Sequence, residues 1–256
     1  MKTARDIMTS PVITVQPEAT VAEAATVLVD HRISGMPVVD SAGEVVGIVV
    51  EPIQGAGGHR VALPEFFRRL SELAHQYDTY LCFDEVQTAG GQTGTMFMAD
   101  QFDLPHPPQA VAAAKKFANG VVYMLYPMKD RGVLDSTWGG NLADMVRFVR
   151  EMEIVRQEQL LEQVPRKTQL LTDGLLRLAA KHGHLLFNIR GAGLYQGFTM
   201  RTASDKGKLL DLALENEDLL LLGAGAQTIR LRPMLDVTPE DILLLLEKLD
   251  RCLGDL

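Results

Sequence analysis

The stretch Leu81-Cys82-Phe83-Asp84-Glu85-Val86-Gln87-Thr88 decides how this chain folds. It is an apolar run that ends in two acids and an amide, which is typical of a buried strand followed by a functional loop. Open α/β sheets bind ligands at the carboxyl ends of their strands, so these polar residues are expected to face a site. The stretch therefore predicts both a central strand and the position of a binding site.

Three chemical roles are open to the acids at the end of this strand. A Mg²⁺-holding acid of a nucleotide hydrolase needs a phosphate loop, and the sequence contains no GxxxxGK[ST] pattern. Paired carboxylates for acid/base work must face one cleft, but neighbouring strand residues such as Asp84 and Glu85 point to opposite faces. The third role, an acid that faces a heteroaromatic cation, is favoured by the sequence that follows.

The segments around this stretch predict an α/β fold. A helix is expected over 64–77, before the strand at 80–83, and a further strand over 110–114, after a Gly-rich loop. Downstream, helices are expected over 142–161, 167–182 and 239–253, with Thr238 as the last N-cap, and extended runs over 185–189 and 194–199. The C-terminal part is therefore expected to form a smaller α+β domain.

Residues 1–50 are predicted to form a β-α-β-β unit, with its helix over 21–31. The pieces ARDIMTSPVITVQPEATVAEAATVL, HRISGMPVVD and GEVVGIVV resemble a partial cystathionine-β-synthase-type (CBS) domain, a regulatory module that binds adenosine nucleotides. One alternative function is therefore a CBS-type nucleotide-binding regulatory module. The second helix and the ribose-binding acid of such modules have no counterpart, because the last strand continues into Glu51 and Pro52.

A second resemblance covers residues 51–256. The runs Asp84-Glu85-Val86-Gln87-Thr88 and Gly90-Gly91-Gln92-Thr93-Gly94, followed by a lysine after an apolar run, resemble the class III aminotransferase signature DEVQTGxGxTG…K. That family has the fold-type-I architecture and uses pyridoxal 5′-phosphate (PLP). The resemblance implies that Asp84 pairs with the protonated pyridine nitrogen, Val86 packs on the ring and Gln87 bonds the phenolic oxygen. A protonated ring nitrogen lets the ring absorb the carbanion charge formed on the substrate.

The resemblance also implies a lysine that forms the Schiff base with the cofactor. The family's pattern indicates Lys115, with Lys116 as the alternative. A lysine must lose its proton before it can attack, so it needs desolvation or a cationic neighbour. The apolar run 111–114 and the adjacent Lys116 supply both.

A third segment points to a subfamily and to an assembly. Residues 135–147, DSTWGGNLADMVR, resemble the STWGGN(L)xDMVR stretch of lysine 6-aminotransferases. The threonine of that stretch reaches the cofactor phosphate of the neighbouring subunit, so Thr137 implies a homodimer. Trp138 is expected to be buried at the contact, because a monomer rarely tolerates a large apolar patch.

Two further segments resemble the same family. Residues 51–58, EPIQGAGG, resemble its EPIQGEGG strand end, and residues 229–235, IRLRPML, resemble its VRFRPPL. By this resemblance Arg230 binds the carboxylate of the substrate or of 2-oxoglutarate, a task that suits a planar bidentate donor. Ala56 replaces the glutamate of GEGG that is thought to neutralise this arginine.

Together these resemblances imply an organisation and a reaction. We expect a partial CBS-like domain over 1–50, a remnant of the aminotransferase large, cofactor-binding domain over 51–141, and the small domain over 142–256. The expected reaction transfers the terminal amine of lysine, or of a similar ω-amine, to 2-oxoglutarate. The family's upstream half, which carries the phosphate loop and the ring-stacking aromatic, has no counterpart here. A non-catalytic fragment is therefore the second alternative.

The composition argues against several other functions. The net charge of −8 and the lack of a Lys/Arg cluster oppose a nucleic-acid partner. The two cysteines, Cys82 and Cys252, form no CxxC pair, and the run 182–184, His-Gly-His, lacks a third ligand, so no metal site is expected. The apolar runs are too short to cross a bilayer, so we expect no membrane partner and a cytoplasmic protein.

Overall fold

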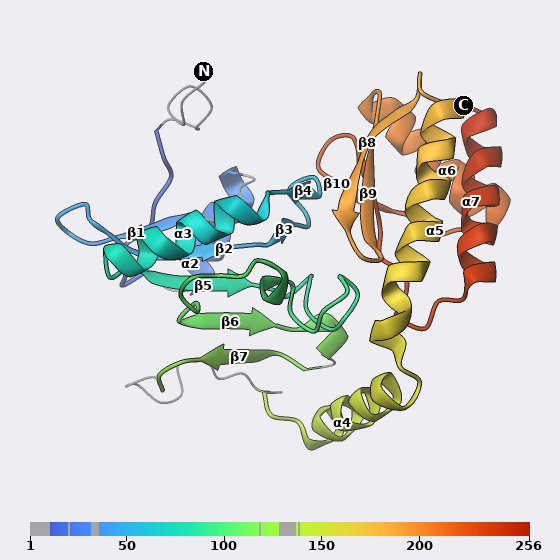
Figure 1. Cartoon of the computed structure of the whole chain (residues 1–256). Coiled ribbons are helices and arrows are strands. Elements are labelled where there is room, and N and C mark those ends of the chain that lie inside the picture. Colours follow the sequence, from blue (N-terminus) through green and yellow to red (C-terminus); the bar gives the residue numbers. More distant parts are fainter. Residues whose placement is uncertain (1–10, 20, 32–35, 118, 128–136, 138) are drawn as a thin grey trace.

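The computed structural model describes residues 11–19, 21–31, 36–117, 119–127, 137 and 139–256. Two sheets organise this part of the chain, each with its own helices (Figure 1). The first sheet has five strands in the order β1-β2-β5-β6-β7, and the second has four in the order β10-β11-β9-β8. A hairpin of β3 (Ile53–Gln54) and β4 (Arg60–Val61) lies between the two sheets.

The first sheet is built around the strand that the sequence singles out. Its strands are β1 (Pro37–Val39), β2 (Val45–Val50), β5 (Tyr80–Asp84), β6 (Ala110–Ala113) and β7 (Val121–Met124). Strands β2, β5 and β6 are parallel, whereas β1 and β7 run antiparallel to their neighbours. Leu81 and Phe83 of β5 are almost fully buried, as expected for the centre of a parallel sheet. The central strand and its helix α3 are thus confirmed.

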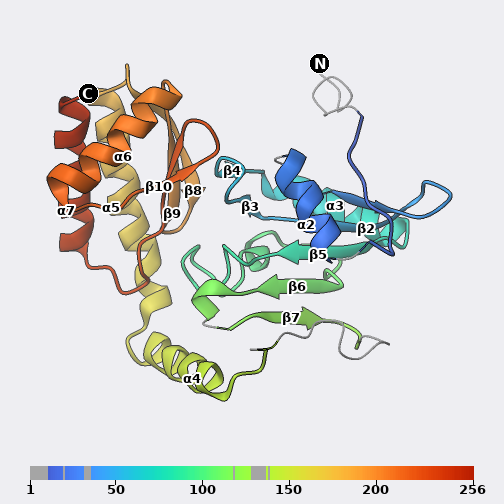
Figure 2. The same cartoon turned by 180° about the vertical axis from the view of Figure 1, so that it is seen from behind.

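Helix α3 (Pro64–Gln76) covers one face of this sheet, and helix α2 (Val21–His31) lies on the other (Figures 1 and 2). Pro64 suits the first helical turn, where its missing N–H leaves no intrahelical bond unmade. The buried residues Phe67, Ser71 and Ala74 follow helical spacing, so this stripe faces the sheet.

The separate CBS-like unit expected over 1–50 is not supported. Its helix and its last two strands form where they are predicted, but β2 runs parallel to β5, with Ile48 opposite Leu81. The first sheet therefore crosses the boundary expected at residue 50. A short β-branched run fits the interior of any parallel sheet, so the pattern Val45–Val50 cannot distinguish the two families.

The second sheet is antiparallel and carries its helices on the face turned away from the first sheet (Figure 1). Its strands are β8 (Leu186–Ala192), β9 (Tyr195–Met200), β10 (Leu222–Ala224) and β11 (Thr228–Leu231), and its helices are α5 (Leu160–Lys181), α6 (Ala203–Glu217) and α7 (Pro239–Gly254). Thr238 caps α7 and forms a capping box with Asp241, which confirms the predicted N-cap. These elements form an α+β arrangement, and the bounds of the small domain expected over 142–256 stay a prediction.

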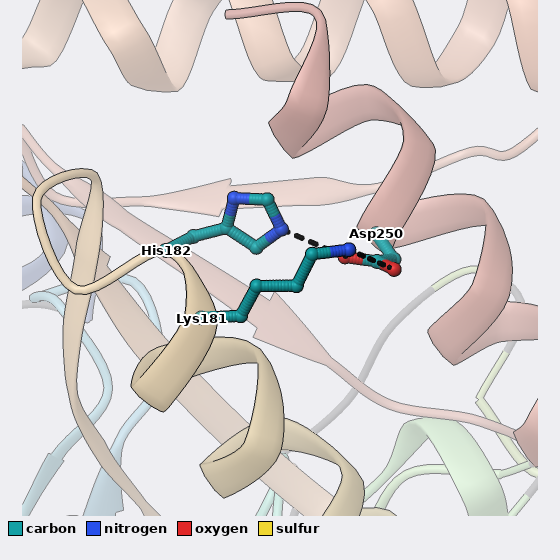
Figure 3. Close-up of polar contacts among 3 residues, drawn as sticks. All are labelled: Lys181, His182 and Asp250. Atoms are coloured by element: carbon teal, nitrogen blue, oxygen red, sulfur yellow. Dashed lines mark hydrogen bonds and ion pairs between the residues drawn. The ribbon is translucent and has the colours of Figure 1, made fainter.

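Helices α5 and α7 are tied together at one end by a shared carboxylate (Figure 3). Asp250 of α7 accepts a hydrogen bond from Nζ of Lys181 and contacts Nε2 of His182, each at 2.7 Å. Both partners hold the pKa of Asp250 below its usual range. His182 therefore has a structural role in joining the two helices. Among the described residues, no group of three or more His, Cys, Asp or Glu side chains could hold a metal ion.

The helix expected over 142–161 ends earlier than predicted. Helix α4 (Leu142–Gln157) stops where Gln159 adopts a left-handed φ of 51°, and α5 then begins at Leu160 rather than at Lys167. Helix α4 buries none of its residues. In the part of the chain that the structure describes, no helix is long and apolar enough to cross a membrane.

Candidate active site

Three of the predicted site residues lie at the carboxyl end of β5. Asp84 ends the strand, and its Oδ1 accepts a hydrogen bond from the backbone N–H of Val86 at 3.0 Å. This bond fixes the turn that carries Gln87. Asp84, Val86 and Gln87 are all half-buried, so a ligand can reach them at the carboxyl end of the strand.

The neighbouring acid Glu85 has a different role. It is fully buried, and its carboxylate accepts hydrogen bonds from Thr88 Oγ1 and from the backbone N–H groups of Met98 and Ala99, each at 2.8 Å. Burial raises its pKa, and these hydrogen bonds oppose the shift. Glu85 thus stabilises the loop after β5 through hydrogen bonds from its buried side. The alternation that separates it from Asp84 is the one predicted from strand geometry.

The Gly-rich loop lets the backbone approach the lysine pair closely. A Cβ on Gly90 would lie 2.7 Å from Cβ of Lys116, and one on Gly91 would lie 2.4 Å from Cδ2 of Leu161. Both glycines have positive φ, 98° and 94°, a conformation that other residues rarely adopt. The loop therefore packs β5 against the segment after β6 and against α5.

Lys115 lies after β6, at a backbone with a left-handed φ of 55°. The residue is exposed, so only partial desolvation lowers the pKa of its amine; the cations Arg232 and Arg230 lower it further, and Asp84 and Glu51 oppose them. These four charged groups are the ones that the amine senses, so the structure brings the predicted lysine, acid and arginine into one neighbourhood. A depressed pKa is what an attacking amine needs.

Lys116 lies in a more confined position than Lys115. Its Nζ donates a hydrogen bond to the carbonyl oxygen of Pro233 at 2.9 Å. Burial, with help from Arg232, lowers the pKa of this lysine to about 8. Lys116 therefore ties the segment after β6 to the segment after β11.

The second sheet contributes two arginines to the same region. Arg230 lies on β11, and its Nε is buried without a hydrogen-bond partner among the described residues. Arg232 follows the strand and donates from Nη1 to Oε1 of Gln87 at 2.7 Å. An amide whose oxygen accepts this bond keeps its NH₂ group for another acceptor.

The turn between β3 and β4 links both sheets. The carboxylate of Glu51 accepts a hydrogen bond from the N–H of Gly55 at 2.9 Å. On the other side, Arg190 of β8 donates from Nε to the carbonyl of His59 at 2.7 Å and from Nη2 to Oγ1 of Thr228 at 2.9 Å. The turn is therefore held rigidly beside the arginines.

No hydrogen bond or ion pair among the described residues joins Thr137 to this cluster. It lies in an exposed turn. Its neighbour Trp138, and with it the expected burial of the indole, lies outside the described residues. The reach of Thr137 into a neighbouring subunit stays a prediction.

Sequence reasoning missed Tyr195, Arg232 and His59. Tyr195 is fully buried, and its hydroxyl belongs to the same junction as Arg230. A tyrosine in the apolar run 194–199 carries no local signal of function. Arg232 was part of the quoted IRLRPML motif, and the clue available was its spacing of two from Arg230, which places both on one side of an extended chain.

The residues at this junction fit PLP on several counts. A half-buried carboxylate, an amide with a free NH₂ and a lysine of lowered pKa match the ring nitrogen, the phenolic oxygen and the aldehyde carbon of the cofactor. The buried Nε of Arg230, which has no hydrogen-bond partner in the described part of the chain, suits an anionic substrate group.

Comparison with known proteins also indicates an aminotransferase. The model of the family described as Aminotransferase class-III matches residues 5–253. A curated L-lysine-epsilon aminotransferase of Mycobacterium tuberculosis is 37% identical over 209 residues, which cover 78% of this chain and 45% of the relative. An acetylornithine aminotransferase of Prochlorococcus marinus is 31% identical, over 80% of this chain and 50% of the relative. The chain thus spans about half the length of the curated relatives it matches.

A solved aminotransferase structure has a similar fold. Lysine aminotransferase from M. tuberculosis in the internal aldimine form superposes with a TM-score of 0.77 at 32% identity, over 96% of this chain and 57% of that chain. The family match starts at residue 5 and the superposition covers nearly the whole chain, so neither supports a CBS domain over 1–50.

Proposed function

The chain belongs to the class III aminotransferase family, and we propose on this premise that it transfers the terminal amine of lysine, or of a similar ω-amine, to 2-oxoglutarate with PLP as cofactor. Class III aminotransferases depend on PLP. When bound, the cofactor supplies an electron sink that stabilises negative charge on the amine-bearing carbon of the substrate. The observation that carries the proposal is the hydrogen bond from Arg232 to Gln87, which joins the segment after β11 to the turn after β5, where Asp84 and Arg230 also act on the charge of Lys115.

Asp84 and Gln87 are proposed to orient the cofactor ring. The carboxylate of Asp84 holds a proton at the ring nitrogen, and the one oxygen bound to Val86 N–H fixes its direction. Gln87 donates from its amide NH₂ to the phenolic oxygen, because Arg232 already occupies its Oε1. Val86 packs on the face of the ring.

Lys115 is proposed to bond the cofactor and to move the proton. Partial desolvation and the two arginines lower the pKa of this exposed lysine, which raises the fraction of free base at neutral pH. Nζ of Lys115 would hold the cofactor when it is bound, and the same atom would move the proton at the amine-bearing carbon of the substrate. Lys116 is set aside for this role because its Nζ already binds the carbonyl of Pro233.

Arg230 is proposed to bind the carboxylate of the substrate. It presents a guanidinium with an unpartnered, buried Nε among the residues that the structure describes. Ala56, at the position where the family carries glutamate, brings no competing carboxylate to this arginine. We further propose that the active protein is a homodimer to which Thr137 contributes across the subunit contact.

Turnover tests this proposal. Full-length protein with PLP, lysine and 2-oxoglutarate is expected to form glutamate, and the Lys115→Ala variant is expected to form none. The Lys116→Ala variant serves as the matched control and should keep measurable activity. Absence of glutamate at saturating substrates and cofactor would overturn the proposed reaction and favour the non-catalytic alternative.

Light scattering tests the proposed assembly separately. A dimer of the 28.1 kDa chain is expected at micromolar concentration. A monodisperse monomer would contradict the homodimer.

A further inference from the structure

Gln92 of the Gly-rich loop is a fully buried amide to which the proposed reaction assigns no role. Its Nε2 donates a hydrogen bond to the backbone carbonyl of Gln87, whereas its Oε1 has no hydrogen-bond partner among the described residues. A buried amide with one unsatisfied end adds little to stability, because the lost hydration of that end offsets the bond at the other. The burial of Gln92 therefore calls for a role other than stabilising the fold.

The bond from Gln92 completes the hold on the turn after β5. On one side of Gln87, Oδ1 of Asp84 accepts a hydrogen bond from the N–H of Val86 at 3.0 Å, which fixes the chain that enters Gln87. On the other side, Gln92 binds the carbonyl of Gln87 and fixes the peptide plane that leaves it. Because peptide units are planar, the two flanking planes set the direction in which the side chain of Gln87 leaves the backbone.

Gln92 is itself held from the second sheet. Its backbone oxygen accepts a hydrogen bond from the N–H of Leu194 at 2.7 Å, and Leu194 is 0% exposed. A Cβ on Gly193 would lie 2.3 Å from the same oxygen, so the turn between β8 and β9 packs directly on the backbone of Gln92. Gln92 therefore cannot move away from Gln87 unless this turn moves with it.

The Gly-rich loop does not depend on the side chain of Gln92 for its shape. Backbone hydrogen bonds of 2.8 and 2.9 Å close the loop over residues 90–96. Gln101 adds a bond from its Nε2 to the carbonyl of Thr93 at 3.0 Å. These bonds join the loop to itself and to the segment after it, whereas the amide of Gln92 reaches out of the loop to Gln87.

We propose that Gln92 is a positioning residue for the cofactor, because it fixes the backbone from which Gln87 directs its NH₂ group at the phenolic oxygen of PLP. Arg232 fixes the other end of Gln87 by donating to its Oε1 at 2.7 Å. The two bonds together leave the NH₂ group of Gln87 as the donor for a ligand. This inference rests on the proposed function, because that function assigns the phenolic oxygen to Gln87.

Gln92→Met tests this role, since it removes the amide and keeps an unbranched side chain of similar length. Absorbance titration should show PLP affinity lowered by roughly three- to tenfold, the range expected for one lost hydrogen bond. Gln101→Met is the matched control, because it removes an amide bond to the same loop without touching Gln87, and it should bind PLP as the parent does. The melting temperature of Gln92→Met should stay close to that of the parent, because the variant also removes the unpartnered Oε1 from the interior.

A double-mutant cycle separates positioning from a general structural effect. In a Gln87→Ala background the directed NH₂ group is absent, so Gln92→Met should cause little further loss of PLP affinity. A loss of the same size in both backgrounds would overturn the inference, because Gln92 would then act through a group other than Gln87. Equal PLP affinity in Gln92→Met and in the parent would overturn it as well.

Hydrogen exchange on the full-length, cofactor-free protein gives a readout that needs no PLP. The amides of residues 84–89 should exchange faster in Gln92→Met than in the parent or in Gln101→Met. Unchanged exchange at these amides would overturn the inference, and a parent that binds no PLP would overturn both the inference and the proposed function. A parent that binds PLP in a Gln92-dependent manner but forms no glutamate would instead refute the proposed reaction and leave the positioning role standing.

Discussion

Arg232 donates a hydrogen bond from Nη1 to Oε1 of Gln87 at 2.7 Å, which joins the segment after β11 to the turn after β5. The two residues are 145 positions apart in the chain. The bond couples the second sheet to the residue proposed to hold the phenolic oxygen of the cofactor. Arg232 therefore fixes the orientation of the Gln87 side-chain amide.

Removal of Arg232 should weaken cofactor binding. Arg232→Met leaves Gln87 free to rotate and removes a bond to a charged group, for which about 1.5–3 kcal/mol is typical, so PLP affinity should fall roughly tenfold or more. Absorbance titration with PLP measures this. Arg177→Met, on the exposed face of α5, is the matched control. Equal PLP affinity in Arg232→Met and the parent would contradict the positioning role.

His59 should make the protein sensitive to acid. Burial lowers its pKa from 6.5 to about 4 in the folded state, with a further contribution from Arg190. Between these two values the unfolded chain binds a proton that the folded chain does not. Stability therefore falls as pH drops from about 6.5 to 4, by on the order of 3 kcal/mol from this group.

Urea unfolding of the parent and of His59→Asn at several pH values tests this expectation. Asparagine tolerates the left-handed φ of 53° at this position, so the variant removes the titration with little backbone strain. The stability difference between parent and variant should shrink or reverse as pH falls from 6.5 to 4. A difference that is independent of pH would show that His59 does not carry the effect.

Gly174 should resist substitution although it lies inside a helix. A Cβ there would lie 2.1 Å from Cδ1 of Leu246, where α5 packs against α7. Gly174→Ala should therefore destabilise the protein by about 1–3 kcal/mol through overpacking.

Gly207 of α6 provides the control for that substitution, since a Cβ there meets no atom within 4 Å. Gly207→Ala should stabilise the protein by roughly 0.5–1 kcal/mol through helix propensity. Thermal melts of both variants measure the contrast. If both variants were more stable than the parent, the Leu246 side chain would have to move aside, and α5 and α7 would not be tightly packed at Gly174.

The parts of the fold that the sequence predicted have strong local signals. The apolar run before Asp84 indicated β5, and Thr238 followed by Pro239 indicated the start of α7. The boundary between α4 and α5 was missed because Gln159 breaks the helix without a glycine or proline to mark it. Pro165 lies inside α5, a position at which proline usually disrupts a helix. Helix α6 was not predicted, although Thr202 caps it.

The site was predictable only where one segment carries the signal. Asp84, Val86 and Gln87 lie within a single motif, and Lys115 follows an apolar run. The close approach of the Tyr195 hydroxyl to Gly55 depends on how the two sheets meet, which no local pattern encodes. The same holds for the bond from Arg232 to Gln87, because its two ends come from different sheets.

The covalent bond between Lys115 and the cofactor is the most direct test of the account. Full-length protein is incubated with PLP, the Schiff base is reduced with borohydride, and the modified peptide is located by mass spectrometry. A visible absorption band before reduction and a single pyridoxyl group on Lys115 are expected, and both should be lost in Lys115→Ala but kept in Lys116→Ala. Modification of Lys116, or scattered labelling of surface lysines without an absorption band, would contradict it.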